Sequence, residues 1–112
     1  MKTWIIERSV KLAKTSTYHP YLHGAIVESG GRVLAMATNS ARPFKGAFST
    51  HAEIAALAKA GLLAKDADLY VSRFCPSGRM GLSRPCPDCH KAIEAAGIKR
   101  VFYSTETGWE RL

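Results

Sequence analysis

Apolar residues recur at helical spacing along the first part of the chain. Between residues 3 and 15 an apolar side chain appears every three or four positions, with charged residues between them. This period predicts an amphipathic helix, and the pair His19-Pro20 predicts a break after it because proline lacks a backbone N–H. The apolar positions are Ile5, Ile6, Val10, Leu12 and Ala13, and Trp4 is expected to join the core.

The segments that follow have the composition of β-strands. Residues 22–29 and 32–39 are rich in β-branched and small apolar side chains, and Gly30-Gly31 stands between them. Such a link is typical of a tight hairpin turn. Residues 67–74 and 99–104 contain further β-branched and aromatic residues and are predicted to be strands as well.

Two more helices are predicted to alternate with the later strands. One runs from about His51 to Ala60, with Gly61 as its C-cap, and the other begins after Pro85 and runs to about Ala96. The remaining segments are predicted to be two loops, 40–49 and 75–83, and a tail or short extra element at 105–112.

This order of elements predicts a single α/β domain over residues 1–112. The hairpin supplies antiparallel strands, and crossover helices between the later strands imply parallel pairing, so the sheet should be mixed. Helices on both faces of that sheet give a three-layer α/β/α arrangement.

Composition narrows the class of protein without changing this fold. Apolar residues make up 46% and charged residues 22% of the 112 positions, as in soluble globular domains, and no apolar run is long enough to span a membrane. Glu7 and Arg8 interrupt any apolar stretch of a secretory signal, so we expect a cytoplasmic protein. The formal net charge of +7 favours anionic partners such as phosphates, nucleotides or nucleic acids.

The cysteines point to a metal rather than to disulfides. There are three of them, and an odd number does not close a disulfide framework. Cys86 and Cys89 are spaced to lie on one side of a helix start, and His51 begins the other helix. Helix N-termini favour the thiolate form of cysteine. Two thiolates and one imidazole suit Zn²⁺, and three protein ligands leave its fourth position open for water, as in catalytic sites.

Glu53 has two interpretations. Thr50 and Glu53 fit a capping box, in which the acid only satisfies the helix start. Beside a metal held by His51, Cys86 and Cys89, the same carboxylate could instead carry protons during hydrolysis of an amidine-like carbon.

A closed structural zinc site and a redox pair are the competing interpretations of the cysteines. His90 lies four residues after Cys86 and could supply a fourth ligand, and His19 and His23 are looser candidates. A redox Cys86–Cys89 pair leaves His51 and Glu53 without a role. Cys75 is interpreted as a bystander thiol, and the role of Trp109 stays open.

The segments "HAE" (51–53) and "PCPDC" (85–89) together resemble the zinc motif of the cytidine and deoxycytidylate deaminase superfamily. The resemblance implies that His51, Cys86 and Cys89 bind one Zn²⁺ per chain and that Glu53 is the general acid/base. It also implies a cytidine deaminase-like domain shortened at its C-terminus, because relatives continue with a further strand and helix.

The resemblance extends to substrate contacts. It implies that Asn39 contacts the sugar hydroxyls and that the backbone N–H of Ala52 holds the base. Two basic segments, 41–48 and 72–84, precede the two metal-ligand helices. The first contributes Arg42, Lys45 and Phe48, and the second Arg73, Arg79 and Arg84. From them Phe48 and Arg84 are candidates to stack a base and hold a phosphate.

The expected function is therefore the deamination of cytidine, deoxycytidine or dCMP, with release of ammonia. The first alternative is a deaminase of cytosine or adenine in single-stranded DNA or RNA, a partner less favoured because a small domain offers little grip on a strand. The second alternative is a non-enzymatic zinc-stabilised binding module. By resemblance to relatives that complete their pockets across subunits, a homo-oligomer is expected.

Overall fold

The computed structural model describes residues 2–16, 22–41, 49–75 and 79–112. Its elements in chain order are α1 (Thr3–Lys14), β1 (Leu22–Ser29), β2 (Arg32–Thr38), β3 (Ser40–Ala41), β4 (Ser49–Thr50), α2 (Ala52–Ala60), a 3-10 turn (Gly61–Ala64), β5 (Asp68–Phe74), β6 (Met80–Gly81), α3 (Pro87–Ala95), β7 (Arg100–Ser104) and β8 (Trp109–Arg111).

The main sheet is mixed, as the sequence predicts. Its strand order is β2-β1-β5-β7-β8. β1 is antiparallel to both β2 and β5, whereas β5 and β7, which flank α3 in sequence, are parallel. Gly30 and Gly31 form the predicted hairpin turn with positive φ values of 59° and 87°, which glycine adopts without a steric penalty.

The structure adds short strands to the segments predicted as loops and tail. β8 pairs antiparallel with β7 and so forms one edge of the sheet, which is the short extra element that was one of the two alternatives for residues 105–112. β6 pairs with the end of β5, and β3 pairs with β4 in a separate two-stranded sheet. These strands are two or three residues long, too short for a period-two pattern to mark them.

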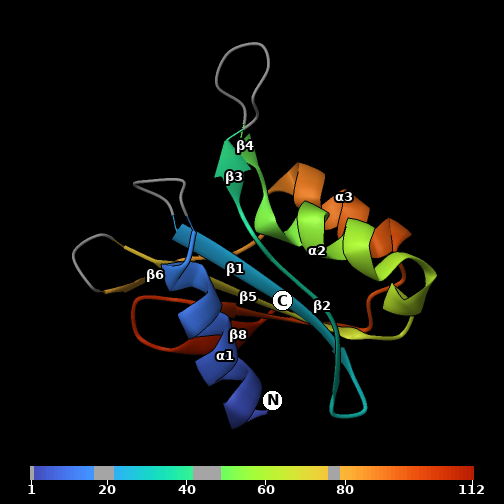
Figure 1. The fold of residues 1–112 in the computed structure, drawn as a ribbon, viewed down its shortest axis with the longest axis horizontal. Helices are drawn as coiled ribbons and strands as arrows, with labels where there is room; N and C mark the ends of the chain where they lie inside the picture. The colour runs from blue at the N-terminus through green and yellow to red at the C-terminus, as the bar shows by residue number, and fades with distance from the viewer. Residues whose placement is uncertain (1, 17–21, 42–48, 76–78) are drawn as a thin grey trace.

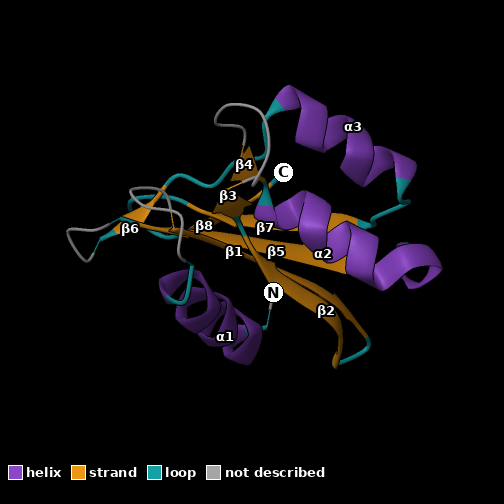
Figure 2. Ribbon diagram, turned by 45° about the horizontal axis from the view of Figure 1, so that its top comes forward, coloured by secondary structure: helices purple, strands orange, loops and turns teal. Residues whose placement is uncertain are grey.

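Helices cover both faces of the sheet, which confirms the three-layer arrangement. Figure 2 shows α1 on one face and α2 and α3 on the other, and Figure 1 shows α2 and α3 side by side. No helix within the described ranges combines the length and the apolar content needed to cross a membrane.

α1 packs closely against β1. Its buried residues are Ile5, Ser9 and Ala13, and a Cβ added to Gly24 of β1 would lie 2.8 Å from the backbone nitrogen of Ala13. The absence of a side chain at Gly24 therefore permits this contact. The expectation that Trp4 joins the core was wrong, because Trp4 is 42% exposed and lies under the guanidinium of Arg8.

The opposite face buries mostly small side chains beneath α2 and α3. Ala25 and Val27 of β1 contact a core that includes Ala52 and Ala56 of α2 and Ile93 of α3. Side chains of this size let α2 pack close over the sheet.

Two ion pairs join elements at the end of the sheet where β1 ends and β5 begins. The Lys2 ammonium is 2.7 Å from the buried Glu28 carboxylate, and Arg100 donates two hydrogen bonds of 2.9 Å to Asp68. At the β2 edge, Lys59 of α2 donates a 3.0 Å hydrogen bond to the backbone carbonyl of Met36.

Candidate active site

The two helices on one face of the sheet begin next to each other. His51 is the N-cap of α2 and Cys86 the N-cap of α3, both with extended backbone angles. Both residues were expected in the first helical turn and lie just before it. Pro87 at the first helical position is suited to this start, because its missing N–H would have had no partner there.

The three predicted metal ligands come together. Their donor atoms all lie within 4.8 Å of one another, and His51 Nδ1 is 3.0 Å from Cys89 Sγ and 3.8 Å from Cys86 Sγ. The backbone N–H of Cys89 points to Cys86 Sγ at 3.5 Å. One imidazole nitrogen and two sulfurs are a donor set that zinc favours. The residues present therefore fit a zinc ion.

Accessibility differs across this cluster. His51 is exposed, Cys86 is half-buried and Cys89 is 2% exposed. One side of the cluster thus faces solvent, from which a small molecule can approach.

None of the other described residues joins this group of donors. His90 is exposed on α3 and lies 3.2 Å from Glu94, and neither Cys75 nor His23 belongs to the group. His19 lies outside the described residues. The described part of the chain therefore supplies three ligands rather than a closed set of four.

Glu53 is buried next to the donor group. It is 4% exposed, and its Oε1 has no hydrogen-bond partner among the described residues. Burial raises the pKa of Glu53, against the smaller opposing effects of a backbone hydrogen bond and of His51 and Cys89. The carboxyl of Glu53 therefore holds a proton more readily than an exposed carboxyl does.

The capping-box interpretation of Glu53 was wrong. The N-cap is His51 rather than Thr50, which places Glu53 at the second helical position instead of the third. No side-chain hydrogen bond caps α2 at this N-cap. A cap therefore does not account for the acid.

The thiol of Cys89 departs from the expectation for a helix N-terminus. Burial raises its pKa, and the neighbouring Glu53 and Cys86 raise it further. Desolvation and nearby negative charge thus outweigh the helix dipole here. A cation at the donor group would reverse this balance, because metal binding favours the thiolate.

Asn39 is buried and its carboxamide oxygen has protein partners. Asn39 Oδ1 accepts hydrogen bonds from Ser16 Oγ at 2.6 Å and from the backbone N–H of His23 at 2.9 Å. The residue thereby joins the end of α1 to the start of β1. The sequence predicted only a sugar contact, because nothing in its pattern pairs Asn39 with Ser16.

Two of the three other residues predicted to contact the substrate, Ala52 and Arg84, lie in the described part of the chain. Ala52 is fully buried at the first position of α2, where the backbone N–H has no partner inside the helix. Arg84 is exposed two residues before Cys86. It lies near Tyr103, whose pKa is raised by a hydrogen bond to Glu110 and lowered to a lesser degree by Arg84. Phe48 lies outside the described residues.

His23 lies near the site, although sequence reasoning gave it only a loose role. It has the same strand parity as Ala25 and Val27, whose side chains face α2, and it pairs with Arg73 across the ladder. Burial lowers the pKa of His23 to about 4, with smaller contributions from Arg73 and His51. The alternation of β1 could have placed His23 on this face, but not next to His51.

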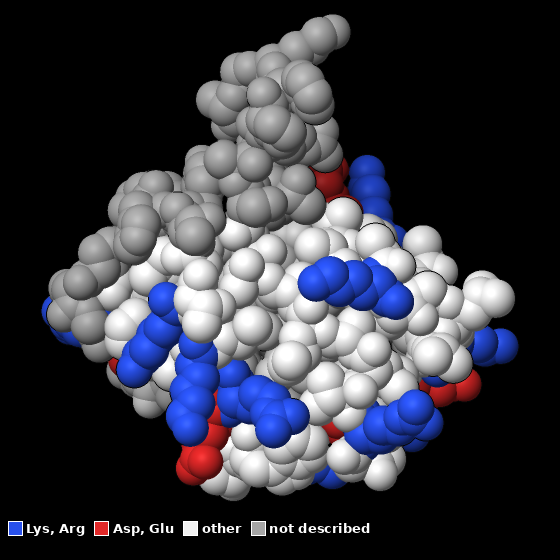
Figure 3. All heavy atoms as spheres, viewed as in Figure 1, with Lys and Arg blue, Asp and Glu red and all other residues white. Residues whose placement is uncertain are grey.

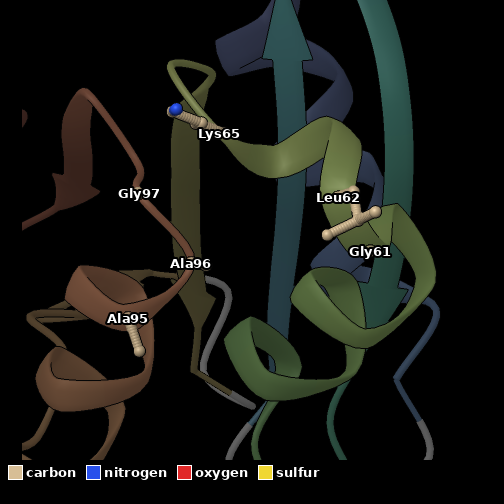
Figure 4. A pocket seen from close by; sticks show the side chains of 6 residues that line it. All are labelled: Gly61, Leu62, Lys65, Ala95, Ala96 and Gly97. Atoms are coloured by element: carbon tan, nitrogen blue, oxygen red, sulfur yellow. The ribbon is translucent and has the colours of Figure 1, made fainter.

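A cavity of about 440 Å³ lies at the other ends of the two helices. It is lined by Gly61, Leu62, Lys65, Ala95, Ala96 and Gly97, as Figure 4 shows. Lys65 is the one lining residue with an ionisable side chain. This cavity therefore lacks the groups for hydrolysis, and the donor group is the better candidate for chemistry.

Among the described residues, one group of basic side chains lies on α1. On the face drawn in Figure 3 a group of Lys and Arg side chains covers α1, which carries exposed Arg8, Lys11 and Lys14. Of the basic loop residues, Arg79 and Arg84 are exposed and Arg73 is half-buried, whereas Arg42 and Lys45 lie outside the described residues.

Curated relatives include two proteins named riboflavin biosynthesis protein RibD. The one from Bacillus amyloliquefaciens is 46% identical over 56 residues, which are 50% of this chain and 14% of that protein. The one from Aquifex aeolicus is 38% identical over 82 residues, which are 73% of this chain and 20% of that protein. The chain thus spans a fifth or less of the length of these relatives.

Among solved structures, the dCMP deaminase of cyanophage S-TIM5 is similar over nearly the whole chain. In its apo form it is 30% identical with a TM-score of 0.68, covering 96% of this chain and 87% of that one. The same protein has been solved in complex with dCMP and dUMP. The model of the cytidine and deoxycytidylate deaminase zinc-binding region matches residues 1–105. The chain therefore belongs to the cytidine and deoxycytidylate deaminase family, whose zinc-binding region it contains.

Proposed function

We propose that this chain is a zinc-dependent hydrolytic deaminase that converts a cytosine nucleoside or nucleotide to its uracil form. The substrates proposed are cytidine, deoxycytidine and dCMP. The observation that carries the proposal is the buried carboxylate of Glu53 beside three converging donors that suit zinc. One oxygen of this carboxylate has no partner among the described residues.

His51, Cys86 and Cys89 would hold the ion, which when bound supplies Lewis-acid activation of water at the reacting carbon. Cys89 supplies the buried side of the donor set and His51 its exposed side. The open side is therefore the direction from which the pyrimidine enters.

Glu53 is proposed as the proton carrier. Its raised pKa and its Oε1, which has no partner among the described residues, suit a group that carries two protons in turn. It takes the first from water and passes it to the ring nitrogen, and it takes the second from the new C4 hydroxyl and passes it to the departing amine. The C4–O bond forms first and the C4–N bond to the protonated amine then breaks, so water and the aminopyrimidine give the oxopyrimidine and ammonia. No oxidant or reductant is required.

Four residues are proposed to hold the substrate. The backbone N–H of Ala52, at the start of α2, is proposed to hold the base. Asn39 is proposed to contact the sugar hydroxyls, and its Oδ1 also accepts a hydrogen bond from the backbone N–H of His23. Arg84, exposed near Cys86, is proposed to attract an anionic group, and Phe48 to stack on the base.

A second candidate substrate follows from the RibD relatives. The similarity to these proteins supports an aminopyrimidine of riboflavin biosynthesis instead of a cytosine nucleotide. A structurally similar Thermotoga maritima protein is a diaminohydroxyphosphoribosylaminopyrimidine deaminase and 5-amino-6-(5-phosphoribosylamino)uracil reductase. That substrate class has the same amidine-like carbon and also carries a phosphate.

A substrate panel on zinc-loaded protein tests these proposals. We would measure ammonia released from cytidine, deoxycytidine, their monophosphates, a phosphoribosylated diaminopyrimidine and a cytosine-containing single strand, with Glu53→Gln as the inactive control. Release from the cytosine monomers supports the first proposal, and release from the diaminopyrimidine alone supports the second. Release from the strand alone, or from no substrate, contradicts both.

We propose in addition that the chain acts as a homo-oligomer. Two apolar side chains at the end of α2 are open to solvent, since Leu62 is 98% and Leu63 66% exposed. Burial of such side chains between copies would stabilise an assembly. Light scattering coupled to size exclusion tests this, and a mass equal to one chain at micromolar concentration contradicts it.

A further inference from the structure

We propose that Ser83 and Ser104, here called the serine clasp, are positioning residues that fix Cys86 for metal binding. The inference rests on the proposed zinc site, but not on the identity of the substrate. It starts from the place where the parallel strands β5 and β7 stop pairing, just before the loop that leads to α3.

The regular ladder between β5 and β7 ends at Val71 and Tyr103. Beyond it, Ser83 Oγ donates a 2.7 Å hydrogen bond to the carbonyl of Val71 and accepts a 2.7 Å bond from the N–H of Ser104. The hydroxyl of Ser83 thus stands between the two strands. It satisfies one backbone group of each strand where they no longer pair directly.

Ser104 completes the clasp from the other side. Its Oγ donates a 2.8 Å hydrogen bond to the carbonyl of Gly81 and accepts a 3.0 Å bond from the N–H of Arg73. The N–H of Ser83 donates a 2.9 Å bond to the carbonyl of Ser104. Residues 81 to 83 are therefore tied to the ends of both strands at once.

Both serines are removed from water, so these bonds have no solvent competitor. Ser83 is 2% exposed and Ser104 is fully buried. Loss of either hydroxyl would leave buried backbone groups without a partner, which is costly. The clasp is accordingly a rigid anchor for the segment that it holds.

The anchor is three residues from a metal ligand. Only Arg84 and Pro85 separate Ser83 from Cys86, and proline fixes its own φ and restricts the residue before it. The buried ring of Pro85 adds to this restriction. The position of Cys86 relative to His51 and Cys89 is thus set from the sheet through the clasp, as well as by α3.

Zinc affinity tests the clasp without using catalysis. We would measure it by competition with a chromophoric chelator for Ser83→Ala, Ser104→Ala and the double variant. Ser72→Ala is the matched control, because Ser72 is a fully buried serine of β5 whose hydroxyl bonds to Ser9 on the α1 face. We expect Ser83→Ala to bind zinc about 10-fold more weakly than Ser72→Ala, at the low end for residues that orient metal ligands.

Coupling and spectroscopy give two further measures. Because the serines act as one unit, the double variant should lose little more affinity than Ser83→Ala alone. With Co²⁺ in place of zinc, the visible absorption of the clasp variants should shift or weaken as the tetrahedral geometry is distorted, and that of Ser72→Ala should not change. Ser104→Ala leaves the Ser83 bonds to Val71 and to the Ser104 N–H in place. It therefore keeps the test available if Ser83→Ala does not fold.

The outcomes separate the clasp from the proposed function. If the clasp variants that fold bind zinc as tightly as Ser72→Ala and give its cobalt spectrum, the clasp proposal is wrong even if their melting temperatures fall. If the unaltered chain binds no zinc, the metal site itself is wrong. If it binds zinc but deaminates nothing, only the proposed function fails.

Discussion

His51 Nδ1 lies 3.0 Å from Cys89 Sγ, although 38 positions separate the two residues in the chain. The contact exists because α2 and α3 start at the same end of the sheet and on the same face. Neither helix alone carries the donor set, so a metal bound there would hold the two together. Metal affinity and folding stability should therefore be linked in this protein.

The donor group predicts different zinc contents for variants of the three cysteines. Cys86→Ser and Cys89→Ser should reduce bound zinc from one ion per chain to almost none, because each removes a sulfur donor from the group. Measurement is by metal analysis after desalting. Cys75→Ser is the matched control, since Cys75 is outside the donor group. Loss of zinc from Cys75→Ser as well would contradict the assignment of ligands.

The proposed role of Glu53 predicts a loss of rate without a loss of metal. Glu53→Gln preserves the size and hydrogen-bonding capacity of the side chain but removes its ability to accept and return a proton. We expect the rate of deamination to fall by about 1,000-fold, with bound zinc unchanged. Glu94→Gln, an exposed acid on α3, should retain the full rate. Near-normal turnover by Glu53→Gln would remove this residue from the mechanism.

The burial of His23 predicts how stability depends on pH. Its pKa is lowered from 6.5 to about 4 in the folded chain, so the unfolded chain binds a proton between these values that the folded chain does not. The contribution of His23 to the free energy of unfolding of metal-free protein should therefore fall as pH decreases from 6.5 towards 4, by at most about 3 kcal/mol. The raised pKa of Glu53 acts in the opposite direction, so the contribution of His23 is read from the difference between the unaltered chain and a His23 variant. Chemical denaturation in the presence of a chelator measures this change.

The variant His23→Gln provides the control for the dependence of the free energy of unfolding on pH. His23→Gln should flatten the profile between pH 6.5 and 4, whereas replacement of the exposed His90 by Gln should leave it unaltered. An equally steep profile in His23→Gln would place the titrating group elsewhere.

The close approach of α1 to Gly24 predicts a large effect of one methyl group. The Cβ of Gly24→Ala would meet backbone atoms of Ser9 and Ala13 at 3.0 and 2.8 Å, which cannot move aside independently of α1. We expect a loss of about 2 kcal/mol in the free energy of unfolding, within the range for overpacked cores. Ser29→Ala, at the exposed end of β1, should change stability little. An unchanged stability of Gly24→Ala would mean that α1 is free to shift on the sheet.

Local patterns in the sequence were sufficient for the larger elements. The hairpin, the long strands and the three helices were predicted to within about two residues, because each has the period or turn chemistry that marks it. The donor group was also predictable, since the spacing of Cys86 and Cys89 and the position of His51 at a helix start are local features.

Contacts between distant segments could not be predicted in the same way. Trp4 has the spacing of a core residue but lies on the outer side of α1, and β8 becomes a strand only because β7 pairs with it. The raised pKa of Cys89 depends on burial, and the serine clasp depends on three segments meeting. Each of these features follows from tertiary packing, which no local pattern encodes.

The edges of the sheet have a consequence for the behaviour of concentrated solutions. In the described part of the chain the outer strands are β2, where Lys59 bonds to the Met36 carbonyl, and β8, three residues long with two charged side chains. A strand from another molecule that docked on β2 would have to displace and desolvate an ammonium group, and β8 offers little length to extend. Growth of fibrils by edge-to-edge addition is thus discouraged at both borders.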